Sequence, residues 1–177
     1  PIPIVHGMTL GELALMVNGE GWLPGSRKCD LAVIKCKNYT HQTRYQLPIP
    51  PSPNLPNMKS IYLYPSTCFF EATPVSLGRG TSLPFQVYGH PNMTGYNYSF
   101  TPRSIPGAKN PPQLNKLCHG VNLSNMSDEE IWKRGVDLTY VIDAYRNLNL
   151  DDHFFRPFFE LLVGRDYVRK MIKEGKS

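Results

Sequence analysis

The segment at residues 68–81, CFFEATPVSLGRGT, places one carboxylate beside two phenylalanines and one guanidinium between two glycines. Burial against Phe69 and Phe70 would raise the pKa of Glu71 and suit a general acid. Alternatively, Glu71 pairs with Arg79, eight residues later, and stays ionised. A structural pair that supports a loop is the simpler interpretation of these residues, and the sequence alone favours it.

Arg79 is the sharper signal in this segment. Gly78 and Gly80 on either side allow close backbone approach, and a guanidinium can bind a carboxylate or phosphate through two parallel hydrogen bonds. Arg103, in FTPRS after a predicted strand, is a second donor of the same kind. The pattern indicates a small anionic ligand or, since single arginines are common in loops, no charged ligand at all.

Other catalytic patterns are missing from the sequence. It contains no GxSxG nucleophile elbow, HExxH helix, phosphate-binding P-loop or GxGxxG turn. The histidines show no ligand spacing, so we expect no metal and no cofactor. The histidines are His6, His41, His90, His119 and His153.

Five N-x-S/T sequons leave two interpretations open. Taken literally they indicate a eukaryotic secreted glycoprotein, whereas an asparagine-rich and turn-rich chain that never meets a glycosyltransferase would contain them too. The sequons begin at Asn38, Asn92, Asn97, Asn122 and Asn125.

The four cysteines have no metal-finger spacing. If residues 30–36 form a strand, Cys29 and Cys36 lie about 23 Å apart and on opposite faces, so they cannot form a disulfide with each other. A disulfide between Cys68 and Cys118 is possible, but we expect buried free thiols.

Composition predicts one loop-rich α+β domain over residues 1–177. The 17 prolines and 14 glycines require long turns and extended loops. The net charge of +5 comes from scattered Lys and Arg without a basic run, which argues against nucleic acid as a partner. No stretch approaches 18 uncharged apolar residues, so we expect no transmembrane segment.

Local patterns predict the elements. A Thr9/Glu12 capping box begins a helix in residues 8–22, and residues 30–36 have the β-branched content of a buried strand. The proline-rich segment 47–57 reads as a packed extended loop rather than a linker. Residues 57–72 fit a strand or, as we prefer, a short helix capped by Asn57.

The second half of the chain predicts a small mixed sheet with flanking helices. Strands are expected at residues 83–89, 96–102 and 118–123, joined by loops. The C-terminal part is helical, starting at a second capping box formed by Ser127 and Glu130. It is broken at Gly164 and stopped at Gly175.

Several of these segments follow one another in the order found in a known family. HGMTLGELALMVNGE, LPIPPSPNLPN, YLYPSTCFFEATPVSLGRGT, PFQVYGHP and FTPRS together resemble the C-terminal domain of NamZ-type exo-β-N-acetylmuramidases, over about residues 6–175. One departure is visible. The family pattern F-E-G-T-N is here Phe70-Glu71-Ala72-Thr73-Pro74, whereas Ser76 and Gly78–Thr81 match.

The resemblance implies a bacterial hydrolase that releases N-acetylmuramic acid from the non-reducing ends of peptidoglycan fragments. Its setting would be cell-wall recycling in the periplasm or outside the cell. It further implies that a Rossmann-like N-terminal domain, absent here, carries the catalytic glutamate, so this chain alone would be inactive. Arg79, and next Arg103, would bind the lactyl carboxylate of the sugar, and Ser76 would also bind the substrate. Glu71 would orient Arg79 or act as a second acid.

Two other classes remain open. One is a stand-alone cell-wall glycan-binding or scaffold module that presents aromatic side chains, although Trp22 and Trp132 both fall in helical patterns. The other is a proline-loop peptide ligand or secreted glycoprotein, which rests on PIPPSP and the sequons alone. An upstream Rossmann-type half in the same reading frame would favour the muramidase.

Overall fold

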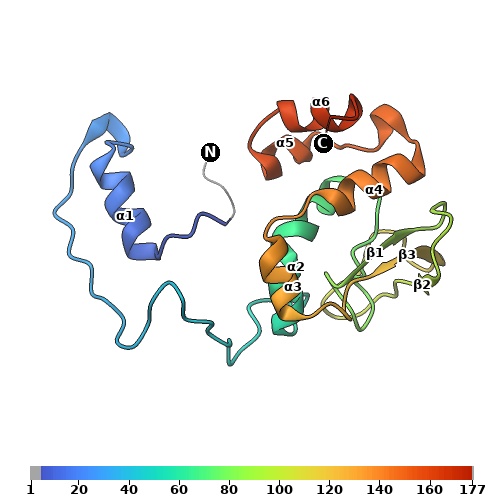
Figure 1. Ribbon diagram of the computed structural model, residues 1–177, viewed down its shortest axis with the longest axis horizontal. Coiled ribbons are helices and arrows are strands. Elements are labelled where there is room, and N and C mark those ends of the chain that lie inside the picture. Colours follow the sequence, from blue (N-terminus) through green and yellow to red (C-terminus); the bar gives the residue numbers. More distant parts are fainter. Residues whose placement is uncertain (1–4, 177) are drawn as a thin grey trace. The chain divides into compact units, whose positions relative to one another are not determined.

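The structure, a computed structural model, describes residues 5–176 and divides into two compact units (Figure 1). The first unit is Val5–Gln46, and the second begins at Leu47. The boundary falls at the start of the proline-rich segment, which belongs to the second unit. Each unit is described by itself below.

The first unit contains helix α1 (Leu10–Gly19) and the short 3-10 turn η1 (Pro24–Ser26). The predicted capping box is confirmed, because Thr9 accepts from the Glu12 amide and the Glu12 side chain accepts from the Thr9 amide. Glu12 also lies 2.9 Å from Nε2 of His41. The bond from the Thr9 backbone, and next the bond to His41, lower the pKa of Glu12 to about 2.

The strand expected at residues 30–36 does not form. This segment is extended chain without a strand partner among residues 5–176, and Ile34 is 93% exposed. β-branched residues favour a pleated surface, but a strand also needs a neighbour for its backbone donors and acceptors. Cys29 and Cys36 are accordingly exposed free thiols.

The second unit starts with the proline-rich segment, of which only the middle packs. Ser52 and Leu55 form an isolated backbone bridge, and Leu55 lies against the core, whereas Leu47 and Ile49 are exposed. The prediction that this segment packs as an extended loop is therefore confirmed for Leu55 but not for Leu47 or Ile49. The loop leads directly into Asn57, which caps the next helix.

Helix α2 (Met58–Thr67) confirms the preference for a helix over a strand. Asn57 and Ser60 exchange the two capping-box hydrogen bonds at its start. The helix passes through Pro65 and continues as the 3-10 turn η2 (Cys68–Ala72), which carries Glu71.

Three short strands form an antiparallel sheet with the order β1-β3-β2. They are β1 (Val87–His90), β2 (Tyr98–Phe100) and β3 (Cys118–Asn122). The last two lie within their predicted ranges, whereas β1 begins four residues later than predicted and ends one residue beyond residue 89. Tyr88 joins the main core on one face, whereas Val87, Phe100 and Cys118 form a small cluster. Alternation along β1 thus buries both faces of the strand.

The C-terminal part is helical, as predicted. Its elements are α3 (Asp128–Arg134), α4 (Thr139–Leu148), the 3-10 turn η3 (Asp151–His153), α5 (Phe158–Val163) and α6 (Tyr167–Lys173). Ser127 caps α3 by accepting from the Glu130 amide, and Gly164 ends α5 in the left-handed conformation. No helix in residues 5–176 is long and apolar enough to cross a membrane.

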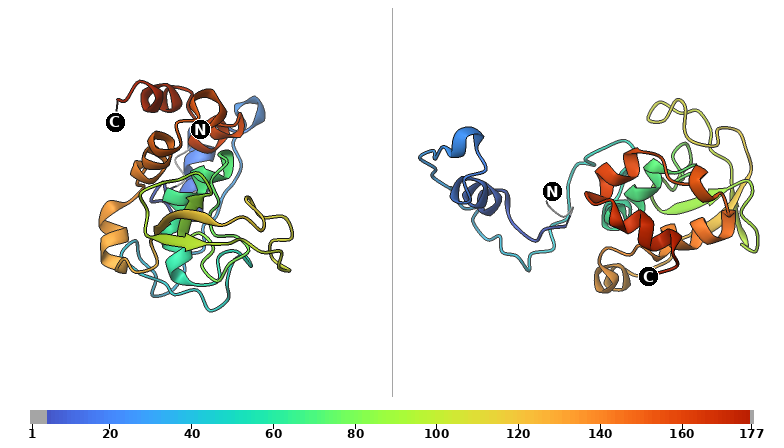
Figure 2. Two further views of the ribbon diagram at one scale, coloured as in Figure 1. Left: turned by 90° about the vertical axis from the view of Figure 1, so that its right-hand side faces the viewer. Right: turned by 90° about the horizontal axis from the view of Figure 1, so that it is seen from above.

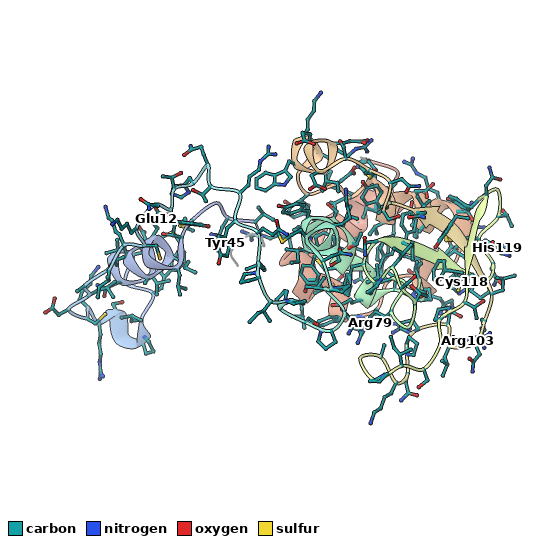
Figure 3. All side chains as sticks on the ribbon, turned by 90° about the horizontal axis from the view of Figure 1, so that it is seen from below. Glu12, Tyr45, Arg79, Arg103, Cys118 and His119 are labelled. Carbon is teal, nitrogen blue, oxygen red and sulfur yellow. The ribbon has the colours of Figure 1, made fainter. Side chains whose placement is uncertain are left out.

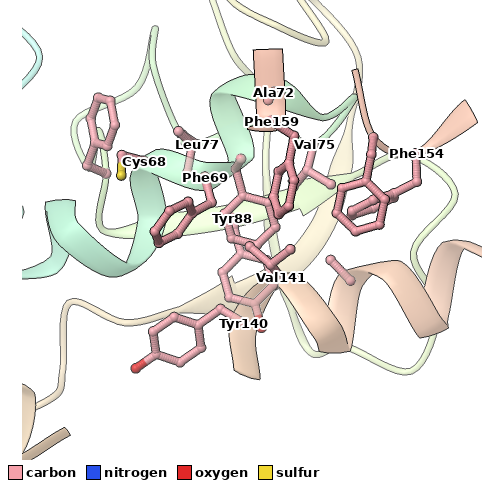
Figure 4. Packing of buried hydrophobic residues seen from close by; sticks show 14 of the residues in the cluster. Cys68, Phe69, Ala72, Val75, Leu77, Tyr88, Tyr140, Val141, Phe154 and Phe159 are labelled. Atoms are coloured by element: carbon pink, nitrogen blue, oxygen red, sulfur yellow. The ribbon is translucent and has the colours of Figure 1, made fainter. Parts of the chain in front are cut away.

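The main core joins η2, the sheet, α4 and α5 (Figure 4). Phe70 stacks on Tyr88 with ring centroids 4.9 Å apart. Asp143 on α4 accepts from the hydroxyls of Tyr88 and Tyr96 at 2.9 and 2.7 Å, which ties the helix to the sheet region. Cys68 and Cys118 are buried free thiols, as expected. This packing fixes the position of η2 and hence of Glu71.

Candidate functional site

The loop that carries Arg79 is held on the edge of β1. Ser76 exchanges backbone hydrogen bonds with Gly89, at 2.8 and 3.0 Å. Its side chain is fully buried, and the Ser76 hydroxyl accepts from the Gly78 amide at 3.3 Å. Ser76 therefore shapes the loop, and its hydroxyl is not presented to a ligand.

Both glycines beside Arg79 are required by the geometry. Gly78 and Gly80 have φ of +71° and +83°, in the left-handed region that L side chains rarely adopt. A Cβ on Gly78 would lie 2.4 Å from a methyl of Val87, and one on Gly80 would lie 2.3 Å from the carbonyl oxygen of Arg103. Close backbone approach, predicted from the sequence, is therefore confirmed.

Glu71 and Arg79 come together as predicted. The Glu71 Oε1 lies 3.9 Å from Arg79 Nη1, which is an ion pair without a hydrogen bond. The Glu71 side chain is 29% exposed and that of Arg79 37%. Burial raises the pKa of the Glu71 carboxyl, and the Arg79 charge opposes this only in part.

Arg79 also has an unsatisfied donor. Its Nε is buried and has no hydrogen-bond partner among the described residues. A buried donor without an acceptor is costly, so native proteins usually supply one from another side chain, from water or from a ligand. The Arg79 guanidinium thus has one buried N–H donor that no described residue satisfies.

Two hollows meet at this pair. The first has a volume of about 270 Å³ and the second of about 230 Å³. Glu71 and Arg79 line both. The first is also lined by Phe70, Val75, Leu77, Pro112 and Phe158. The second is also lined by Ser52, Asn54, Leu55, Tyr64 and Phe85.

The second hollow contains a backbone feature that is unusual for an aromatic residue. Phe85 has φ of +58°, and its side chain is buried. Its amide donates to the Leu77 carbonyl at 2.8 Å, and its ring lies 5.3 Å from that of Tyr64. Left-handed backbone at a bulky residue is a strained conformation that concentrates at functional sites. The loop that carries Arg79 keeps Phe85 in this conformation through the hydrogen bond to the Leu77 carbonyl.

Arg103 is joined to this loop through its backbone. Its amide donates to the Gly80 carbonyl at 2.9 Å, whereas its exposed guanidinium donates to the side chain of Asn115 at 3.1 Å. Figure 3 labels both arginines. Arg103 lines neither hollow, so the structure brings Glu71 and Arg79 together and leaves Arg103 outside them.

Apart from Phe70, which was expected to bury Glu71, sequence reasoning did not identify the other lining residues. Asn54 was part of a proline-rich loop, Tyr64 was a helix residue, and Phe158 was one of four phenylalanines in FFRPFFELL. No sequence signal separates Phe158, which is half exposed, from the fully buried Phe159. Among residues 5–176, no three His, Cys, Asp or Glu side chains gather in a way that could hold a metal ion.

The second unit is a loop-rich α+β fold in which an arginine and a carboxylate, Arg79 and Glu71, line the same surface hollows. Comparison with known families then gives two matches along the chain. Residues 62–177 match the model described as exo-β-N-acetylmuramidase NamZ, C-terminal, and residues 1–59 match its N-terminal counterpart. The chain belongs to the NamZ exo-β-N-acetylmuramidase family.

The predicted family is confirmed, but the extent of the C-terminal domain is corrected. The resemblance placed residues 6–175 in that domain and the N-terminal domain outside the chain, whereas residues 1–59 match the N-terminal model. The chain therefore carries parts of both family regions. The segment HGMTLGELALMVNGE, used as evidence for the C-terminal domain, lies in the N-terminal match.

Three relatives illustrate the similarity. The peptidoglycan β-N-acetylmuramidase NamZ of Bacillus subtilis (strain 168) is 35% identical over 196 residues, which cover all of this chain and 46% of the relative. A crystallised DUF1343 family protein from Bacteroides fragilis NCTC 9343 is 85% identical with a TM-score of 0.96, covering the whole chain and 50% of the other protein. A second such protein from that strain is 25% identical with a TM-score of 0.72, covering 99% of this chain and 51% of its own. The chain spans about half the length of these relatives.

Proposed function

We propose that this chain is part of a peptidoglycan exo-β-N-acetylmuramidase and completes its substrate cleft. The observation that carries the proposal is the placement of Glu71 and Arg79 where two hollows meet, with a buried Arg79 Nε that has no hydrogen-bond partner among the described residues. The bacterial relative named as a muramidase supports the same reaction. We place the enzyme in the bacterial periplasm or outside the cell.

Arg79 binds the carboxylate that distinguishes muramic acid from N-acetylglucosamine. The lactyl ether of muramic acid bears a negative charge, and a guanidinium offers paired donors that match a carboxylate. Arg79 and Glu71 form an ion pair at 3.9 Å without a hydrogen bond, so a ligand carboxylate can compete for the guanidinium donors. Glu71 acts as a positioning residue that keeps Arg79 directed into the hollows until the substrate arrives.

The division of the lining suggests how a sugar fits. Apolar side chains of the first hollow suit methyl groups, such as those of the lactyl and acetamido substituents. The amide of Asn54 and the hydroxyls of Ser52 and Tyr64 in the second hollow suit the hydroxyls of a sugar ring. A carboxylate between them would reach Arg79 from either side.

The test uses the full-length protein that contains this chain and measures release of N-acetylmuramic acid from a chromogenic muramyl glycoside. Arg79→Ala should raise KM about a hundredfold, as expected for a lost charged hydrogen bond of roughly 2–3 kcal/mol. Arg79→Lys should recover only part of this loss, since an ammonium lacks the paired donors.

A matched substrate supplies the control. With a glycoside whose lactyl carboxylate has been reduced to an alcohol, the KM values of the wild-type protein and Arg79→Ala should differ little, because the substrate then has no charge for Arg79 to bind. Equal losses on both substrates would mean that Arg79 supports the fold rather than binding the carboxylate. The 177-residue chain assayed alone should be inactive, and activity there would overturn the proposal that it only completes the substrate cleft.

The second candidate function is a cell-wall glycan-binding module without catalysis. The exposed rings of Tyr39, Tyr45 and Trp22 in the first unit favour it, since aromatic faces bind sugars. This candidate predicts that the full-length protein binds muramyl glycans but releases no sugar from them.

A further inference from the structure

The distribution of charge along the second unit is uneven. Between Ala72 and Ser127 the sequence contains no aspartate or glutamate, although it contains Arg79, Arg103, Lys109 and Lys116. The last three of these lie in residues 101–117, here called the basic loop, and all three are exposed. No carboxylate of the described residues lies within 4.0 Å of any of these three cations, so none of them forms an ion pair there.

The basic loop is an ordered part of the unit. Ile105 and Ala108 pair through two backbone hydrogen bonds, and the Asn115 amide donates to the Pro102 carbonyl at 2.8 Å. The Gln113 side chain donates to the Pro74 carbonyl at 2.8 Å, and the view in Figure 2 shows the chain looping out beside the sheet. Because the backbone of the loop is already ordered, the loop itself loses little conformational entropy on binding, which favours affinity.

The basic loop also borders the candidate site. Pro112 of this loop lines the first hollow. Asn54, which lines the second hollow, donates to the Gly107 carbonyl of the loop at 2.9 Å. Arg103 is bonded through its backbone to Gly80, next to Arg79. A long ligand that extends out of either hollow on this side would therefore contact the basic loop.

The surface of the loop is not purely charged. Ile105 and Leu117 are exposed next to its cations. Sugar rings present apolar C–H faces together with hydroxyls, and an anionic glycan adds carboxylates at intervals. A mixture of exposed aliphatic side chains and unpaired cations fits such a polymer by charge complementarity.

We infer that the basic loop is a second anion-binding surface, which holds a carboxylate of a longer glycan chain beyond the sugar bound near Arg79. The inference rests on the proposed function, because it takes the glycan as the ligand of the neighbouring hollows. Arg103, Lys109 and Lys116 supply the charges. Arg103 thereby binds a different carboxylate from the one that Arg79 reads.

The test compares two triple variants of the full-length protein that remove the same charge. One is Arg103→Gln, Lys109→Gln, Lys116→Gln in the basic loop. The other is Lys133→Gln, Arg146→Gln, Arg165→Gln, at exposed positions of the helical part. Binding is measured by co-sedimentation with insoluble peptide-free wall glycan, once with intact carboxylates and once after their reduction to alcohols.

On intact glycan at about 50 mM salt, the basic-loop variant should bind about tenfold more weakly than the control variant, as expected for three partly screened surface charges. The difference should vanish at about 500 mM salt and on the reduced glycan. Equal binding of the two variants to intact glycan at low salt would overturn the inference. So would a loss of the same size on the reduced glycan.

The same variants separate this inference from the proposed function. If the wild-type protein releases no muramic acid but the loop variant still loses carboxylate-dependent binding, the muramidase proposal fails and the anionic surface stands. If the enzyme is active, the ratio of kcat/KM on long glycan to that on the chromogenic monosaccharide should fall about tenfold in the loop variant alone. An unchanged ratio would count against the surface.

Discussion

Gly80 faces the backbone of Arg103 so closely that a single added carbon would lie 2.3 Å from the Arg103 carbonyl oxygen. The same residues are joined by the hydrogen bond from the Arg103 amide to the Gly80 carbonyl. Two loops far apart in the sequence are therefore locked together at a residue next to Arg79. The position of the guanidinium depends on this contact.

Replacing Gly80 by alanine should destabilise the second unit more than the matched change Gly95→Ala. Both glycines have φ of +83°, but a Cβ at Gly95 meets nothing within 4 Å. Gly95→Ala should cost about 1–2 kcal/mol for the left-handed backbone alone. Gly80→Ala should cost about 1–3 kcal/mol more, because the loops must separate. Urea denaturation of both variants measures the difference, and equal losses would contradict the clash.

The stability of the unit should depend on pH through Glu71. A carboxyl whose pKa is higher in the folded state stabilises the fold while protonated, and this contribution is lost as the pH rises from the unfolded value near 4.5 through the raised folded value. Glu71→Gln imitates the protonated form. It should therefore raise Tm relative to wild type at about pH 7.5 and leave it unchanged near about pH 3.5.

The exposed change Glu174→Gln is the control for this pH experiment. Glu174 forms an exposed ion pair with Lys176, and such surface pairs contribute little to stability, so its replacement should move Tm little at either pH. A Glu71→Gln variant less stable than wild type at about pH 7.5 would show that the pairing with Arg79 outweighs the cost of burying the charge.

Two neighbouring phenylalanines of α5 should differ sharply in their effect on stability. Phe159 is fully buried and packs against Phe69 and Phe155, whereas Phe158 is 47% exposed at the first hollow. Phe159→Ala should cost about 3–5 kcal/mol, and Phe158→Ala about 1 kcal/mol or less. Denaturant titrations give both values. Similar losses would mean that α5 is placed differently against η2.

The four thiols should fall into two classes of reactivity. Burial raises the pKa of Cys68 to about 12 and that of Cys118 to about 11, and thiolates are the reactive form. Ellman's reagent should therefore modify only the exposed Cys29 and Cys36 in the native 177-residue chain. A Cys29→Ser, Cys36→Ser variant should react only after denaturant is added. Rapid labelling of that variant would contradict the burial.

Local sequence signals predicted most of the helices and strands. The capping residues Thr9, Asn57 and Ser127 each start a helix, because a side chain that satisfies the first free amides acts through its immediate neighbours. The prediction of a strand at residues 30–36 was wrong, because a strand forms only where a second segment of the chain supplies its backbone hydrogen-bond partners. Propensity describes a segment alone, and pairing is a property of two segments.

The candidate site was predicted only where its residues are close in sequence. Glu71 and Arg79 are eight residues apart, so their pairing could be proposed from one short segment. Asn54 and Phe158 reach the same hollows from segments 17 residues before Glu71 and 79 residues after Arg79. Arg103 shows the limit, since its backbone touches the glycine loop while its side chain turns to Asn115.

The long stretch without carboxylates gives the second unit an electric dipole. Residues 72–127 contain four Lys and Arg and no carboxylate, whereas the helical part from Asp128 onward contains nine Lys and Arg and ten Asp and Glu. A molecule with such a charge separation rotates in the field of a negatively charged polymer before it touches it. The sheet side would lead at each encounter, so a larger share of collisions would begin with the Arg79 hollows facing the polymer.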